Sequence, residues 1–358
     1  MKIIIWALSG IGDALMFTPA LNLLRKKYPD AIIDVVVMYK GSYDIFKDNV
    51  NINNLYHFDF LKEGIWKSLK FIYHIANKYD VSINVYPSNR VEYNIINLMT
   101  LAKQRLAVKY LREDFINLGF FNNKRILEDD KKHNVVENID LLAEHLNIPK
   151  DYSILLEFYT NNDAKNIAQQ FIDKIGKDNL IIGMHPGCNT LKNHDKRRWD
   201  VENFGLLAKK IIEEFESKIL LFGGPEEKYL REKILEIVNS ENCVSVENVD
   251  LSTSYEIIKN CDYFVTNDSS LMHVASAAKV FVFPIIGPTN LNYIHPWQTE
   301  YMPITLNLEC SPCFYYSPKP LTCNRLDKKF KCIKDLTVDF AFNIIKEIIE
   351  KRGKRCQR

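Results

Sequence analysis

The residues of this 358-residue chain that best suit the binding of an anionic ligand are Asp268, Ser269, Ser270 and His273. They lie between a predicted buried strand at 263–266 and a predicted helix at 271–278, at a carboxyl strand end, where open α/β sheets bind ligands. The first turn of such a helix has free N–H groups and a positive dipole end, which suits a phosphate, and His273 could add a donor. Asp268 could accept hydroxyl groups of a sugar or ribose. The alternative is a capped helix with a structural histidine in an α/β core.

A second candidate site is a basic loop that follows the predicted strand 180–184 and includes Thr190. Five of the seven residues from 192 to 198 are cationic or imidazole side chains: Lys192, His194, Lys196, Arg197 and Arg198. Their charge suits a diphosphate, and a solvated run of charges is the alternative. After the next predicted strand, 218–222, Glu226 could accept hydroxyl protons.

A third candidate is the loop after the first strand, which carries Gly10, Gly12 and Asp13. The two glycines are half of a dinucleotide-binding fingerprint whose third glycine is missing, so the nucleotide signal is weak. Asp13 is a lone carboxylate at a carboxyl strand end. Its alternative role is a helix N-cap.

The elements that must position these loops alternate between strand and helix, which predicts two α/β domains with parallel sheets. We expect strands at 2–8, 31–38, 81–86, 180–184, 218–222, 244–246, 263–266 and 280–286. Helices are expected up to residue 27, with Pro19 in the first turn, and at 66–79, 91–102, 138–146, 164–175, 255–260, 271–278 and 335–351. The segment 107–131 has no clear period and reads as an acceptor-facing flap or as irregular surface, and 147–160 reads as a hinge.

Composition excludes some classes of protein. The net charge of +2 mixes both signs along the chain, which argues against a nucleic-acid binder. The opening apolar run is too short for a signal peptide and no run is long enough to span a membrane, so we expect a cytoplasmic protein. Cys310, Cys313, Cys323 and Cys332 leave structural zinc, disulfides and reduced thiols open. The basic tail 351–358 could contact anionic lipid at the inner membrane or be free in solvent.

Four stretches in order along nearly the whole chain resemble glycosyltransferase family 9, whose best-known members are ADP-heptose:lipopolysaccharide heptosyltransferases. They are SGIGDALMFTPALNLLRKKYPDAIIDVVV, HPGCNTLKNHDKRRW, LLFGGPEE and NDSSLMHVASA followed by GPT. The resemblance implies a GT-B fold, with two Rossmann-like doubly wound domains facing across a cleft. It places acceptor binding in residues 1–160, nucleotide-sugar binding in 161–334, and a helix that crosses back to the first domain in 335–358.

The resemblance also implies an inverting transfer without an essential metal or other cofactor, with Asp13 as general base. The substrate-binding residues would then be Gly12, Thr190, Lys192, Lys196, Arg197, Glu226, Asp268, Ser269, Ser270 and His273. The favoured reaction moves heptose from ADP-heptose to a lipid-linked or core oligosaccharide acceptor. Arg197 stands where the family usually has lysine, and Ser270 replaces a glycine, so another nucleotide sugar for capsule, O-antigen or glycolipid synthesis is one alternative. A non-catalytic nucleotide-sugar-binding protein is another.

Overall fold

The computed structural model describes residues 1–176, 179–315 and 320–353, which fall into two compact units. Unit 1 comprises residues 1–159 together with 292–298. Unit 2 comprises residues 160–291, 299–315 and the described residues from 320 onward. Each unit is built on its own parallel sheet, as expected for alternating strands and helices.

The sheet of unit 1 has the strand order β3-β2-β1-β4-β5-β6 and is parallel throughout. The strands are β1 (Lys2–Ala7), β2 (Ile32–Val37), β3 (Asn54–His57), β4 (Val81–Asn84), β5 (Gln104–Lys109) and β6 (Lys124–Leu127). The central strands are runs of Ile and Val because helices cover both of their faces.

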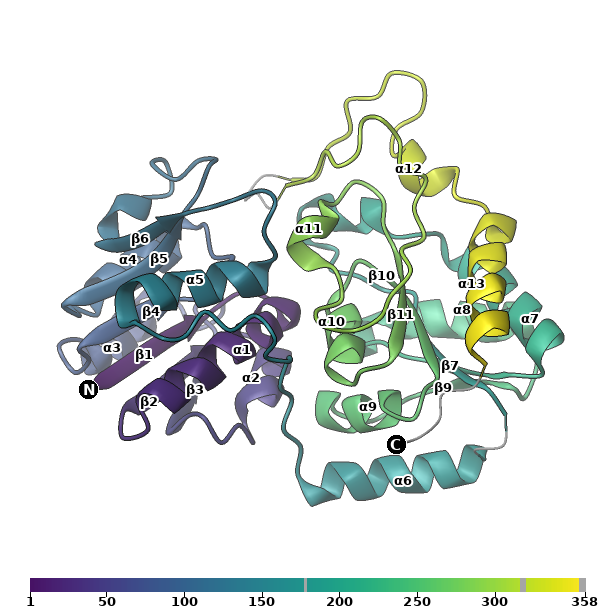
Figure 1. The fold of residues 1–358 in the computed structure, drawn as a ribbon, viewed down its shortest axis with the longest axis horizontal. Helices are drawn as coiled ribbons and strands as arrows, with labels where there is room; N and C mark the ends of the chain where they lie inside the picture. The colour runs from purple at the N-terminus through teal and green to yellow at the C-terminus, as the bar shows by residue number, and fades with distance from the viewer. Residues whose placement is uncertain (177–178, 316–319, 354–358) are drawn as a thin grey trace. The chain divides into compact units, whose positions relative to one another are not determined.

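The helices of unit 1 pack in two groups. They are α1 (Ile11–Lys27), α2 (Lys40–Phe46), α3 (Ile65–Ile75), α4 (Val91–Met99) and α5 (Asn134–Leu146), with a 3₁₀ turn η1 (Gly119–Phe121). Side chains of α3 and α4 pack on the sheet face that carries Ile4, Trp6 and Val36. Helices α1 and α5 contact each other, and Figure 1 shows them in front of the sheet, with α3 and α4 behind it.

The sheet of unit 2 has the strand order β11-β10-β7-β8-β9 and is also parallel. The strands are β7 (Ile181–His185), β8 (Lys218–Leu221), β9 (Cys243–Ser245), β10 (Tyr263–Asn267) and β11 (Phe281–Ile285). The longer helices are α6 (Asn162–Ile175), α7 (Val201–Phe215), α8 (Lys228–Val238), α9 (Leu251–Ile258), α10 (Ser270–Ala277) and α13 (Val338–Arg352). Short turns are η2 (Leu191–Arg197), η3 (Pro225–Glu227), α11 (Leu291–Ile294) and α12 (Lys331–Lys334).

One core of unit 2 joins α7, α8 and α13 to one face of its sheet. Ala341, Ile345 and Ile349 of α13 are buried in this core, and α13 contacts α7. The last helix therefore packs in unit 2, whereas we expected it to cross back to the first domain. The described segment that returns to unit 1 is 292–298, where the Trp297 indole N–H donates to the Ile154 carbonyl (2.8 Å).

Two further expectations differ from the structure in part. The segment 107–131 contains the last residues of β5 and all of β6, while residues 110–123 between these strands are irregular apart from η1. Helix α1 begins at Ile11, which places Pro19 inside the helix and not in its first turn. Pro19 has no N–H for the Leu15 carbonyl, and the Thr18 hydroxyl donates to that carbonyl instead (2.8 Å).

Candidate active site

Both sheets have a topological switch point, where the strand order reverses. In unit 1 the chain starts at β1 and then builds outward on either side, so the reversal lies between β1 and β4. In unit 2 the reversal lies between β7 and β10. Ligands of open α/β sheets bind at the carboxyl strand ends beside such points. The loops that carry the predicted residues follow these strands.

Asp13 lies in the first turn of α1, just after β1 and at the switch point of unit 1. The Gly10 backbone N–H donates to its Oδ2 atom (3.1 Å), so the carboxylate closes the start of the helix. The loop is fixed to the end of β4, because the Ser9 hydroxyl donates to the Pro87 carbonyl (2.6 Å). Burial, and among nearby charges the Asp13 carboxylate, raise the pKa of Tyr93. The Asp13 side chain is half-buried, so a substrate can still reach its carboxylate, which the Gly10 N–H holds in position.

Asp268 follows β10 and is buried at the switch point of unit 2. Its Oδ2 atom accepts from Arg197 Nη1 (2.5 Å) and from the Thr289 hydroxyl (2.6 Å). The basic loop ends at this point, since the Trp199 backbone N–H donates to Asn267 Oδ1 (2.9 Å). Asp268 and Arg197 are therefore brought together as predicted site residues, and the fixed loop end holds them there.

A buried chain of polar groups joins the ends of three strands. His185 Nδ1 lies 2.8 Å from Ser269 Oγ, and His185 Nε2 lies 3.0 Å from Glu227 Oε2. The same carboxylate oxygen accepts from the Gly224 backbone N–H (3.0 Å). A Cβ atom on Gly187 would stand 1.7 Å from the Glu227 carboxylate, so a glycine is required for this approach. We name these residues, His185, Ser269 and Glu227, the strand-end network.

Of the strand-end network, only Ser269 was predicted as a site residue. Glu226 was selected instead of Glu227, and His185 was only quoted as part of a motif. Ser269 is the N-cap residue of α10, but its side chain makes no cap hydrogen bond and contacts His185. Glu227 directly follows Glu226 in the same turn, at the end of η3 and just before α8. This position in the turn is the signal that could have identified it.

The basic loop does not act as one cationic cluster. Lys192 adopts a left-handed backbone conformation (φ 55°), and Lys196 is paired with the neighbouring Asp195 (3.3 Å) and exposed. His194 is half-buried, and burial followed by the positive charge of Arg197 lowers its pKa to about 4, so it is neutral at pH 7. The side chain of Arg197 that reaches Asp268 is 13% exposed. These four groups thus lie in different environments.

The remaining predicted residues lie at the same strand ends of their own units. Gly12 is buried in the first turn of α1 of unit 1. In unit 2 Ser270 is half-buried and begins α10, and His273, in the same helix, is buried. Thr190 and Glu226 are exposed.

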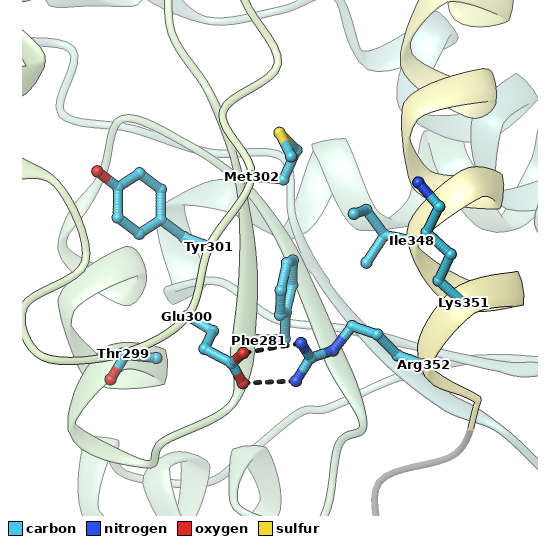
Figure 2. Close-up of a pocket in the computed structure, with 8 residues that line it drawn as sticks. All are labelled: Phe281, Thr299, Glu300, Tyr301, Met302, Ile348, Lys351 and Arg352. Carbon is cyan, nitrogen blue, oxygen red and sulfur yellow. Dashed lines mark hydrogen bonds and ion pairs between the residues drawn. The ribbon is translucent and has the colours of Figure 1, made fainter.

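A pocket of about 540 Å³ in unit 2 lies elsewhere. It is lined by residues of α13 and of the segment after β11, and Figure 2 shows Arg352 reaching Glu300 across it (2.8 and 2.5 Å). Phe281, which also lines it, begins β11, so the pocket lies at the amino edge of the sheet. The switch point lies at the opposite edge, so this pocket is not the candidate site.

The cysteine-rich segment contains four cysteines that form no disulfide within the described residues. Cys310, Cys313, Cys323 and Cys332 are free, and no group of His, Cys, Asp and Glu side chains in the described residues could hold a metal ion. Burial, and then the neighbouring thiols, raise the pKa of Cys332 to about 11. The basic tail from residue 354 onward lies outside the described residues.

No helix in the described part of the chain is long and apolar enough to cross a membrane.

Three comparisons with known proteins show which family and which fold the chain resembles. The chain is 28% identical to lipooligosaccharide heptosyltransferase 2 of Campylobacter jejuni over 97% of this chain and 99% of the relative. It is 23% identical to lipopolysaccharide heptosyltransferase 3 of Escherichia coli over 80% and 82% of the two chains.

A solved structure, the ADP-heptose lipopolysaccharide heptosyltransferase II of Escherichia coli, covers 98% of this chain and 99% of its own, with a TM-score of 0.73 and 20% identity. This likeness and the two parallel-sheet units show the GT-B fold. The model of glycosyltransferase family 9 (heptosyltransferase) matches residues 68–321, which is well over half of the chain and includes the loops after β7, β8 and β10. A match of this extent shows that the chain belongs to glycosyltransferase family 9.

Proposed function

We propose that this glycosyltransferase moves heptose from ADP-heptose onto a lipopolysaccharide-core or related lipid-linked acceptor in the cytoplasm, with inversion and without an essential metal. The observation that most strongly supports this proposal is the ion pair of Asp268 and Arg197. Arg197 Nη1 lies 2.5 Å from Asp268 Oδ2, beside the start of α10 and at the switch point of unit 2. This arrangement combines an acceptor for hydroxyl groups with a cation and a helix N-terminus for phosphate. Several relatives that span most of this chain are named as heptosyltransferases, which supports the choice of sugar.

Asp13 acts as the general base in this proposal. Its carboxylate takes the proton of the acceptor hydroxyl while that oxygen forms a bond to the anomeric carbon of the donor. The bond from that carbon to the diphosphate breaks on the opposite face, and ADP leaves with the electron pair. A single displacement of this kind inverts the anomeric carbon. The hydrogen bond from Gly10 supports this role because it fixes where the carboxylate stands.

The leaving diphosphate gains negative charge as the bond breaks, and it needs groups that stabilise that charge. The first turn of α10 and Arg197 supply a helix dipole and a guanidinium within one loop region. Asp268 orients the guanidinium and binds hydroxyl groups of the donor. The other proposed donor-binding residues, Lys192, Lys196, Glu226, Ser270 and His273, lie on the loops and helix that follow the same strand ends.

The test begins with calorimetric titration of the full chain with ADP, GDP, UDP and CDP. We expect ADP to bind most tightly. Release of ADP from ADP-heptose is then measured with a heptose-free core acceptor, with and without EDTA, and the anomeric configuration of the product is determined by NMR. Equal binding of all four nucleotides would contradict the assignment of ADP-heptose as the donor. Loss of turnover in EDTA would contradict metal independence. A retained anomeric configuration would contradict a single displacement.

A further inference from the structure

Helix α3 of unit 1 presents large apolar side chains to solvent. Trp66 is 82% exposed, Tyr73 is 84% exposed and Ile65 is 70% exposed, while Leu69 is 37% exposed. A soluble protein ordinarily scatters such residues, and a contiguous group of them marks an interaction surface. We name these four residues the α3 ridge.

The ridge is a second apolar face of the helix and not the one that packs on the sheet. At about 100° per residue, the four ridge side chains span an arc of about 100° on one side of α3. Ile72 and Ile75, which are 4% exposed, lie on a different arc and pack in the core of unit 1. Lys67, Lys70 and His74 occupy the remaining arc, and Lys67 and Lys70 are exposed. The helix is therefore divided into a core face, a solvent-facing apolar face and a basic flank.

The charge around the ridge is positive. Between residues 59 and 78 the net charge is +2, and it is carried by Lys70 and Lys78, because Lys62 pairs with Asp59 (3.4 Å) and Lys67 pairs with Glu63 (2.8 Å). Lysines beside an apolar stripe can place their stems on a membrane surface and their ammonium groups among anionic headgroups. Tryptophan and tyrosine suit the same boundary because each has an apolar ring and a polar group.

A second exposed apolar group lies in the loop after β5. Phe115 and Ile116 are 79% and 72% exposed, and the ring of Phe115 lies 5.3 Å from that of Phe120, which is itself 45% exposed. Arg112 and Arg125 flank the loop and pair with Asp130 and Asp114. This group belongs to the same unit as α3.

The topology of the sheet places the start of α3 and the Phe115 loop at the edge of unit 1 that carries Asp13. Helix α3 follows the carboxyl end of β3, the Phe115 loop follows that of β5, and the Asp13 loop follows that of β1. All carboxyl ends of a parallel sheet lie at one edge. Strand β1 stands two positions from β3 and two from β5, or about 10 Å from each. The loop of Asp13 therefore lies at the same edge as the Phe115 loop and the first ridge residues, Ile65 and Trp66, and α3 runs from there back toward the amino end of β4.

We propose that the α3 ridge and the Phe115 loop dock unit 1 on the surface of an anionic lipid bilayer. The net positive charge beside the ridge selects this occupant over an uncharged apolar partner. Docking of this kind presents a lipid-linked hydroxyl to unit 1 from the plane of the membrane. The inference needs no nucleotide and no turnover, so its failure would leave the proposed reaction untouched.

Tryptophan fluorescence gives a direct test. The chain has four tryptophans, of which Trp6, Trp199 and Trp297 are at most 6% exposed, so a change caused by vesicles reports on Trp66. The full chain is mixed with vesicles of phosphatidylglycerol and phosphatidylethanolamine, or of phosphatidylcholine alone. With the anionic vesicles we expect a blue shift and reduced quenching by acrylamide, and cosedimentation that weakens at high salt. Trp66→Phe should cosediment as the unaltered chain does but show no shift.

Matched variants distinguish docking through the ridge from nonspecific adsorption to vesicles. Trp66→Ser/Tyr73→Ser should weaken cosedimentation by about tenfold or more, and Phe115→Ser/Ile116→Ser should weaken it by a smaller factor. The control, Ile167→Ser/Leu206→Ser, changes two half-exposed apolar residues of unit 2 and should bind as the unaltered chain does. Thermal melts check that each variant is folded. Unchanged binding by the ridge variant, or no binding by the unaltered chain, would overturn the proposal. Loss of self-association by the ridge variant in sedimentation velocity would assign the ridge to a second copy of the chain instead.

Discussion

Replacing Glu227 by glutamine should destabilise unit 2 through the strand-end network. The side chain of Glu227 is 13% exposed, and its Oε2 atom contacts His185 Nε2 and the Gly224 N–H, each at 3.0 Å. Glutamine keeps the shape but not the charge. A hydrogen bond to a charged group contributes about 1.5–3 kcal/mol, and the amide retains part of the two contacts, so we expect a loss of about 2 kcal/mol in the free energy of unfolding.

The loss of stability caused by Glu227→Gln should depend on pH, and its direction follows from the lowered pKa of Glu227. Burial alone would raise the pKa of Glu227, but the nearby His185, its hydrogen bond and the Gly224 N–H together lower the pKa below 4.5. A carboxylate whose pKa is lowered by folding stabilises the folded state above the pKa of the unfolded chain. That stabilisation is lost as the pH falls through the folded pKa. The difference between the unaltered chain and Glu227→Gln should be full from pH 6 to 8 and shrink below about pH 4.5.

Urea denaturation followed by circular dichroism at pH 7 and at pH 4 measures this difference. Glu226→Gln is the matched control, because Glu226 is exposed and should show no difference at either pH. Titration with ADP adds a second measurement, since a displaced Ser269 should weaken binding by about tenfold, or about 1.4 kcal/mol. Equal effects of the two substitutions on the free energy of unfolding, or a Glu227→Gln effect on it that is the same at both pH values, would refute the reasoning.

Three further predictions concern the proposed site. Asp13→Asn should lower turnover by about a hundredfold or more while the titrated affinity for ADP stays nearly the same, and retained turnover would exclude Asp13 as the base. Arg197→Ala should weaken ADP binding by about 1.5–3 kcal/mol in calorimetry, whereas Lys209→Ala on α7 should do little, and equal losses would make the basic loop a solvated run of charges. His273→Ala should weaken binding of ADP more than of AMP, and Asp268→Ala should weaken both; a lower melting temperature with unchanged affinities would make both residues structural.

The sequence predicts the buried central strands well because their signal is local. Strands β1, β2 and β7 are short apolar runs that helices cover on both faces, and such runs are readable without knowing the partners. Strand β3 was missed because it is a four-residue edge strand, Asn54–His57, with mostly exposed side chains and no apolar alternation. Helix α2 was missed because its seven residues include a glycine and a serine and make a weak periodic pattern.

The site could be located from the sequence but its internal contacts could not. Strand ends are local features, so the loops of Asp13 and Asp268 were found. The contact of His185 with Glu227 joins residues 42 positions apart, and it depends on which strands are neighbours in the sheet. The same limit applies to α3, where periodicity predicted a helix but not that its ridge faces solvent. Pairing between distant elements decides both cases.

The two aspartates show how burial separates roles that residue type leaves open. Both follow a parallel strand at a switch point, and both could be read as helix caps. Asp268 is 6% exposed and is compensated by Arg197 and Thr289, which suits a carboxylate that holds a ligand or a neighbouring cation in place. Asp13 is half-buried and is held through the Gly10 backbone N–H. A general base must reach a substrate proton and exchange it with solvent, and the half-buried position of Asp13 suits this requirement better than the buried position of Asp268.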